Sequence, residues 1–135
     1  MRYWLMKSEP DVFGWEDLCR AEETVWDGVR NHRAKLNLAT MAVGDQAFFY
    51  HSNIGREIVG TVEVIESGMT DPTCPDNKWS AVRVRPLQAL SRPVTLAQIK
   101  ADQQLAGSEL VRLSRLSVCA ITPAEWAAVL AMAQG

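Results

Sequence analysis

Cysteine and histidine are scarce in this chain of 135 residues. The three cysteines, Cys19, Cys74 and Cys119, are odd in number and widely spaced, with no C-x-x-C pair and no nearby histidine to complete a metal site. We interpret them as reduced thiols, which predicts a cytoplasmic location, or a nuclear one in a eukaryotic cell. The sequence gives no reason to expect a metal ion or any other cofactor.

Long apolar segments are also missing. No run approaches the roughly 20 apolar residues that a membrane span requires. Only four apolar residues separate Arg2 from Lys7, too few for the hydrophobic region of a secretory signal. Apolar residues make up 47% of the chain and charged residues 22%, which is typical of a globular domain. We therefore expect a soluble domain that neither enters a membrane nor is exported.

The usual sequence signatures of enzymes are absent. The chain contains no phosphate-binding glycine loop, H-E-x-x-H, G-x-S-x-G or paired metal-ligand spacing. His51 is a candidate general base, but no acidic or nucleophilic partner stands beside it. A nucleic-acid-modifying enzyme would have to use scattered groups such as Lys7, Tyr50 and His51. The sequence therefore favours a binding protein without catalytic activity.

Repeats and linker-like Gly/Ser tracts are missing too, so we assign residues 1–135 to one domain. Clusters of β-branched and aromatic residues between turn residues predict strands over 3–6, 45–52, 57–67, 79–90 and 117–121. Apolar periodicity and N-cap residues predict helices over 15–20, from Asn31 to Met41, and after the capping boxes that begin at Thr95 and Thr122. Because helices and strands do not alternate regularly, we predict an α+β domain with a curved mixed sheet or a small barrel.

The charge of the chain is unevenly distributed. A net charge of -2 argues against binding to phosphates, but the stretch from Lys78 to Arg115 contains seven basic residues and only two acidic ones. Such asymmetry permits a basic face on an acidic protein. Arg83 and Arg85 share one face of a predicted strand, where solvent exposure is the default and phosphate contact the alternative.

Polar and aromatic residues gather in three segments at predicted element boundaries: 7–10 (KSEP), 26–31 (WDGVRN) and 48–53 (FFYHSN). Such positions usually carry binding groups. Trp26 offers a flat ring on which a base can stack, and a position in the core is its alternative.

Along the strand 45–52 the side chains alternate between two faces. Phe49 and His51 share one face, while Phe48, Tyr50 and Ser52 share the other. We expect one of these faces to pack in the core and the other to line a pocket.

Four segments together resemble the EVE domain family of the PUA-like superfamily: 3–10 (YWLMKSEP), 26–31 (WDGVRN), 44–53 (GDQAFFYHSN) and 115–118 (RLSV). Their order and spacing match as well. The resemblance implies a PUA-like fold, with a curved sheet or small barrel flanked by helices. It also implies a cavity that takes up a nucleobase, notably 5-methylcytosine or its oxidised forms in DNA, or a modified base in RNA. Such a base has to leave the stack before it can be bound.

The resemblance further implies roles for individual residues. Trp26 and Tyr50 would form aromatic walls, polar contacts would come from Ser8, Gly28, Asn31, His51 and Ser52, and Lys7, Arg30 and Arg115 would lie at the rim near phosphates. Two connections, 53–57 and 69–79, are shorter than in longer family members, and both are candidates for the border of the pocket.

We therefore expect a nucleic acid that carries a modified base as the partner. The isoelectric point of about 5.7 leaves open a different class of ligand, a small molecule or a protein bound in the same pocket. A nucleic-acid-modifying enzyme is the third alternative.

Overall fold

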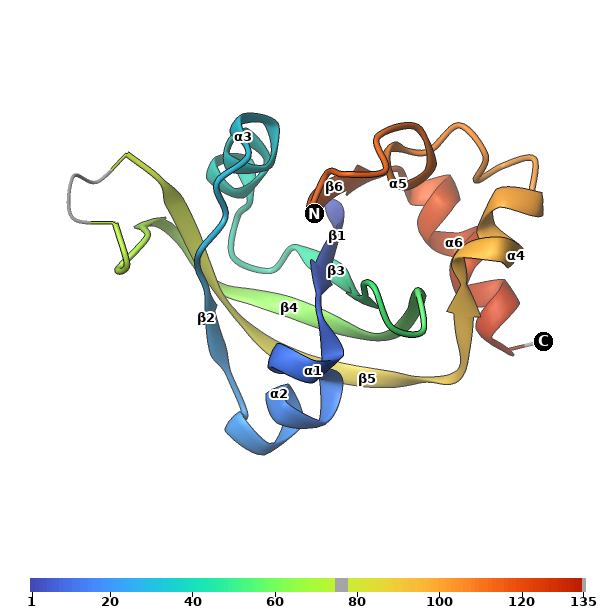
Figure 1. Ribbon diagram of the computed structural model, residues 1–135, viewed down its shortest axis with the longest axis horizontal. Helices are drawn as coiled ribbons and strands as arrows, with labels where there is room; N and C mark the ends of the chain where they lie inside the picture. The colour runs from blue at the N-terminus through green and yellow to red at the C-terminus, as the bar shows by residue number, and fades with distance from the viewer. Residues whose placement is uncertain (75–77, 135) are drawn as a thin grey trace.

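A mixed sheet of six strands forms the centre of the computed structural model, which describes residues 1–74 and 78–134 (Figure 1). The strands are β1 (Tyr3–Ser8), β2 (Thr24–Trp26), β3 (Gln46–His51), β4 (Glu57–Thr70), β5 (Ser80–Thr95) and β6 (Val118–Ile121). The helices are α1 (Pro10–Phe13), α2 (Trp15–Ala21), α3 (His32–Thr40), α4 (Leu96–Ala101), α5 (Glu109–Arg112) and α6 (Pro123–Gln134). This arrangement agrees with the α+β class predicted from the sequence.

The strand order in the sheet is β2-β5-β4-β3-β1-β6. β1 runs parallel to β3, and the other neighbouring strands are antiparallel. Within the described residues no pairing joins β2 to β6, so the sheet is open rather than closed into a barrel. Lys7 and Ser8 at the end of β1 pair with Tyr50 and His51 at the end of β3, which brings two of the three sequence segments side by side.

The hairpin of β4 and β5 spans the molecule from α3 at one end to α4 and α6 at the other (Figure 1). β5 continues to Thr95, beyond the predicted end at residue 90, because Val94 and Thr95 pair with the first residues of β4. The register shifts four times along this pair, and Pro86 lies next to one of the shifts. Such irregularities bend a hairpin and admit proline, which cannot donate to the ladder.

The helix starts that were predicted from local signals are confirmed. The Asn31 side chain accepts a hydrogen bond from the Ala34 N–H (3.0 Å) at the start of α3. Thr122 and Glu125 exchange bonds of 2.9 and 3.1 Å at the start of α6, and Thr95 caps α4 in the same way.

Three short elements were not predicted: β2, α1 and α5, of three or four residues each. Segments this short carry no readable periodicity. β2 forms because it pairs with β5, and that pairing fixes Trp26 at the edge of the sheet.

Core side chains cover both faces of β3. Phe48 stacks on Trp126 of α6 with ring centroids 3.9 Å apart, while Phe49 meets the edges of Trp15 and Trp26 at 5.6 Å. Both phenylalanines are completely buried. The expectation that only one face of this strand packs in the core is therefore wrong, because α6 covers one side and two tryptophans cover the other.

No helix within the described residues is both long enough and apolar enough to cross a membrane. Over the same residues, no group of three or more His, Cys, Asp or Glu side chains is placed to hold a metal ion.

Candidate nucleic-acid interface

Two cavities adjoin the end of β1, and Lys7 lines both of them. The larger has a volume of about 650 Å³ and the smaller about 420 Å³. Either volume is in the range of ligand-binding pockets in proteins. The shared Lys7 side chain makes the two cavities parts of one interface.

The smaller cavity is lined by four apolar or aromatic side chains and four polar ones. Its lining residues are Lys7, Ser8, Val12, Phe13, Thr24, Val25, Trp26 and Asp27. Trp26 is 8% exposed and packs edge-on against Phe49, so it belongs to the core and to the cavity wall at once. The Ser8 hydroxyl donates to the Phe13 carbonyl (2.6 Å), which ties the segment containing α1 to β1.

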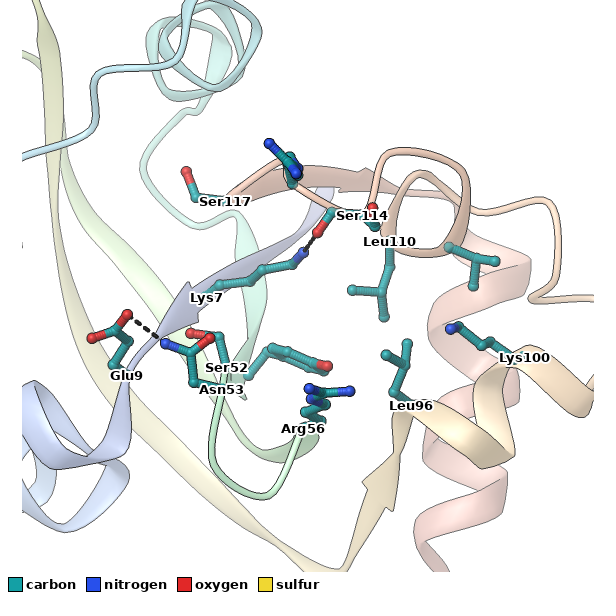
Figure 2. A pocket seen from close by; sticks show the side chains of 13 residues that line it. Lys7, Glu9, Ser52, Asn53, Arg56, Leu96, Lys100, Leu110, Ser114 and Ser117 are labelled. Atoms are coloured by element: carbon teal, nitrogen blue, oxygen red, sulfur yellow. Dashed lines mark hydrogen bonds between the residues drawn. The ribbon is translucent and has the colours of Figure 1, made fainter.

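Polar residues outnumber apolar ones in the lining of the larger cavity, which comes from β1, the end of β3, the turn between β3 and β4, α4, α5, and the segment between α5 and β6 (Figure 2). It is lined by Lys7, Glu9, Tyr50, Ser52, Asn53, Arg56, Leu96, Lys100, Leu110, Val111, Ser114, Arg115 and Ser117. The Lys7 ammonium donates to the Ser114 carbonyl (3.0 Å), and the Glu9 carboxylate accepts from the Asn53 amide (2.6 Å). The lining therefore contains four basic side chains and one carboxylate, which already has a partner.

Lys7 and Tyr50 lie next to each other in the wall of the larger cavity. The Lys7 ammonium lies 5.7 Å from the centre of the Tyr50 ring, within the range of a cation–π contact. Burial lowers the pKa of Lys7. Burial raises the pKa of Tyr50 despite the nearby Arg56, so its hydroxyl keeps its proton at neutral pH. Within the described part of the chain this hydroxyl has no hydrogen-bond partner, which leaves it available to a ligand.

The segment after Trp26 is held by the buried carboxylate of Asp71. This side chain, 0% exposed, accepts hydrogen bonds from the Gly28 N–H (2.7 Å), the Arg30 guanidinium (2.9 Å) and Thr73. Gly28 has a φ of 76°, which glycine adopts without strain. Burial alone would raise the pKa of Asp71, but these hydrogen bonds outweigh it and hold the pKa well below its usual range.

Three of the predicted site residues therefore serve other contacts. Gly28 and Arg30 line neither of the two cavities. The Arg30 guanidinium pairs with Asp71 and lies 5.5 Å from the centre of the Trp79 ring. Asn31 caps α3 and, together with Arg115, lines a third cavity of about 300 Å³.

His51 also lies outside both cavities. Its Nε2 atom accepts a hydrogen bond from the Trp15 N–H (3.1 Å), and its ring meets the edge of Phe49. The lone pair that a general base needs is thus engaged in holding the start of α2. Burial lowers the pKa of His51, although Glu57 acts in the opposite direction.

The lowered pKa of His51 makes the stability depend on pH. The fold favours the neutral ring, so this contribution is complete above the ordinary histidine value of about 6.5 and is lost as the pH falls below it. We expect His51→Gln to flatten the decrease in urea-unfolding free energy between pH 7.5 and 5. His32→Gln, at the exposed histidine, is the matched control and should keep the wild-type slope. An unchanged slope in His51→Gln would assign the pH dependence to other groups.

Sequence reasoning missed several residues of the larger cavity. Arg56 lies in the connection 53–57, a predicted border of the pocket, while Glu9 and Asn53 belong to the polar segments 7–10 and 48–53. Lys100 gave no signal, because α4 reaches the cavity only through the fold. Asp71 lies in the connection 69–79, of which residues 75–77 are outside the described residues.

Comparison with known proteins identifies the family. Residues 2–132 match the EVE domain. The chain belongs to the EVE domain family. Human thymocyte nuclear protein 1 is 33% identical over 164 aligned residues, which cover 96% of this EVE domain and 73% of the human protein. The resemblance seen in the four sequence segments is confirmed.

Solved structures share the fold of this EVE domain. An NMR structure of a Rhodopseudomonas palustris protein has a TM-score of 0.94 at 45% identity, covering 99% of this chain and 94% of that one. A crystal structure of the human thymocyte protein in complex with 5-methylcytosine-containing DNA has a TM-score of 0.90 at 32% identity, covering 100% and 99%. The predicted PUA-like α+β fold is confirmed.

Proposed function

We propose that this EVE domain is a non-catalytic protein that binds a modified nucleobase, such as 5-methylcytosine or an oxidised derivative, in DNA or RNA. The observation that carries the proposal is the adjacency of two cavities at Lys7, one with a tryptophan wall and the other with four basic side chains. The human relative crystallised with 5-methylcytosine-containing DNA supports it. The odd number and wide spacing of the three cysteines, interpreted as reduced thiols, support a cytoplasmic location, or a nuclear one in a eukaryotic cell.

In this proposal the flipped base enters the smaller cavity. Stacking on Trp26 contributes about 1–3 kcal/mol, which offsets much of the cost of flipping. The Asp27 carboxylate accepts a hydrogen bond from the exocyclic amine of cytosine. Val12, Phe13 and Val25 offer apolar contact to a 5-methyl group, worth about 0.8 kcal/mol or roughly a fourfold preference.

We assign the remaining predicted residues supporting roles. Ser8 fixes the wall of the smaller cavity, while Tyr50 and Ser52 line the larger one. Gly28, Arg30 and Asn31 shape the segment after Trp26, and His51 holds α2.

Fluorescence anisotropy with labelled oligonucleotides tests the proposal. We would compare cytosine, 5-methylcytosine and 5-hydroxymethylcytosine, single- and double-stranded, with the wild type, Trp26→Ala and Asp27→Asn. The wild type should prefer 5-methylcytosine over cytosine about fourfold. Trp26→Ala should weaken binding about 5- to 150-fold, because stacking is lost. It should also remove the preference, because a base that no longer stacks is not held where its methyl group meets Val12, Phe13 and Val25. Chromatography should recover the oligonucleotides unchanged.

Controls separate binding from folding. Trp26 also packs in the core, so the thermal melt of its variant is recorded; Asp27 is exposed, and its variant should fold normally. Asp11→Asn, at an exposed carboxylate of α1 outside both cavities, should bind like the wild type. Equally weak binding of every oligonucleotide, unaffected by the variants, would favour a small-molecule or protein ligand instead.

A further inference from the structure

Two of the three basic residues of β5, Arg83 and Arg85, form ion pairs within the fold. Arg85 pairs with Glu63 across the hairpin at 2.7 Å, and Arg83 pairs with Glu66 at 3.1 Å and with Glu23 at 3.2 Å. The two arginines that share a face at the start of β5 are therefore already paired with carboxylates. Attraction for phosphates is expected instead from basic side chains that lack such partners.

Unpaired basic side chains gather instead at the larger cavity. Arg56, Lys100 and Arg115 line it, and none of them makes an ion pair or a side-chain hydrogen bond within the described part of the chain. Lys7 donates one hydrogen to the Ser114 carbonyl, and an ammonium has three. In a protein with a net charge of -2, this concentration of positive charge is local and faces a concave surface.

The turn between β3 and β4 holds Arg56 in place (Figure 2). Arg56 has a φ of 49°, a left-handed conformation that costs a non-glycine residue roughly 1–2 kcal/mol. Its carbonyl accepts a hydrogen bond from the Leu96 N–H (2.9 Å), the first residue of α4. The same helix carries Lys100, so this bond fixes the backbones of the two basic residues relative to each other.

We propose that the larger cavity binds backbone phosphates of the nucleic acid next to the flipped base, with Arg56, Lys100 and Arg115 as their cationic partners. Ser52, Ser114 and Ser117 line the same cavity and offer hydroxyl donors of the kind that often contact phosphate. Lys7 lies where the two cavities meet, between base and backbone. Arg30 does not contact these phosphates in our proposal, because its guanidinium is paired with the Asp71 carboxylate. This inference rests on the proposed function and specifies where the backbone lies.

The test is the salt dependence of oligonucleotide affinity in the double variant Arg56→Gln/Lys100→Gln. Two lost phosphate contacts should reduce the slope of log affinity against log salt by about 1.8 for a duplex or about 1.4 for a single strand. Affinity should fall by the same factor for cytosine and 5-methylcytosine oligonucleotides. Arg83→Gln/Arg85→Gln changes the net charge equally and should keep the wild-type slope.

The outcomes separate this inference from the proposed function. An unchanged slope in Arg56→Gln/Lys100→Gln, with normal thermal melting, would overturn the phosphate assignment and leave base binding intact. Loss of the 5-methylcytosine preference in that variant, with the slope kept, would place the base in the larger cavity and also overturn it. A wild type without any base preference would contradict the proposed function, while a reduced slope on plain oligonucleotides would still support the phosphate contacts.

Discussion

Replacing Asp71 with alanine should lower the free energy of unfolding by about 3 kcal/mol, because it removes one partner of the ion pair with Arg30. The N–H groups of Gly28 and Thr73 also lose their hydrogen-bond acceptor. This loss is at the low end of what removing one partner of a buried ion pair costs, since the Arg30 side chain is 42% exposed and reaches water. Urea unfolding measures the loss. Affinity for a 5-methylcytosine oligonucleotide should fall as well, because the segment that follows Trp26 is no longer fixed.

The decrease in the free energy of unfolding at acidic pH gives a second measure of the contacts made by the Asp71 carboxylate. The fold holds the pKa of Asp71 below its usual value of about 4, so its contribution is present above that value and is lost as the pH falls below it. Asp71→Asn should therefore flatten the decline in stability below pH 4. Asp11→Ala, at an exposed carboxylate, should change stability by no more than about 0.5 kcal/mol. A comparable loss in both alanine variants would contradict a special role for Asp71.

Adding a single methyl group at Gly60 should destabilise the protein by about 1–3 kcal/mol. A Cβ atom on Gly60 would lie 2.5–2.7 Å from three ring atoms of Trp15. That ring has little freedom to move, because it meets Phe49 at 5.6 Å and its backbone N–H is bonded to His51. Thermal and urea unfolding of Gly60→Ala measure the effect.

Two further variants identify the cause of that loss. Trp15→Leu combined with Gly60→Ala should lose less stability than the two single variants together, because the smaller side chain makes room for the methyl group. Gly107→Ala, where a Cβ would meet nothing within 4 Å and no positive φ is required, should be neutral or slightly stabilising. If the stability losses of the two single variants simply add up in the double variant, the clash with Trp15 is not the reason why Gly60→Ala destabilises the protein.

The parts of the fold that the sequence predicts are those decided locally. The cap residues Asn31, Thr95 and Thr122 form hydrogen bonds within their own first turn, so their helices were located correctly. β2 and the last five residues of β5 depend on partners distant in the sequence. Their boundaries were accordingly missed, since pairing and not composition makes them strands.

The residues of the candidate site also differ in whether the sequence alone could predict them. Resemblance to the family selected Trp26 and Lys7, which line the cavities. The resemblance did not predict that Arg30 pairs with a carboxylate 41 residues away, or that Lys100 lines the larger cavity. The pairing of Arg83 and Arg85 with glutamates of the neighbouring strand β4 is equally impossible to predict from a single sequence, because it depends on strand register.

The position of β1 between β3 and β6 bears on how the protein acquires its ligand site during folding. Lys7 contacts Ser114, 107 residues later in the chain, and β1 pairs with β6. Such distant pairings form slowly, because the long intervening chain has to be closed first. A nascent chain thus has no complete larger cavity until residues 114–117 have left the ribosome. Nucleic acid that occupies both cavities would then bind only molecules that have folded this far, and by mass action it would protect them from unfolding.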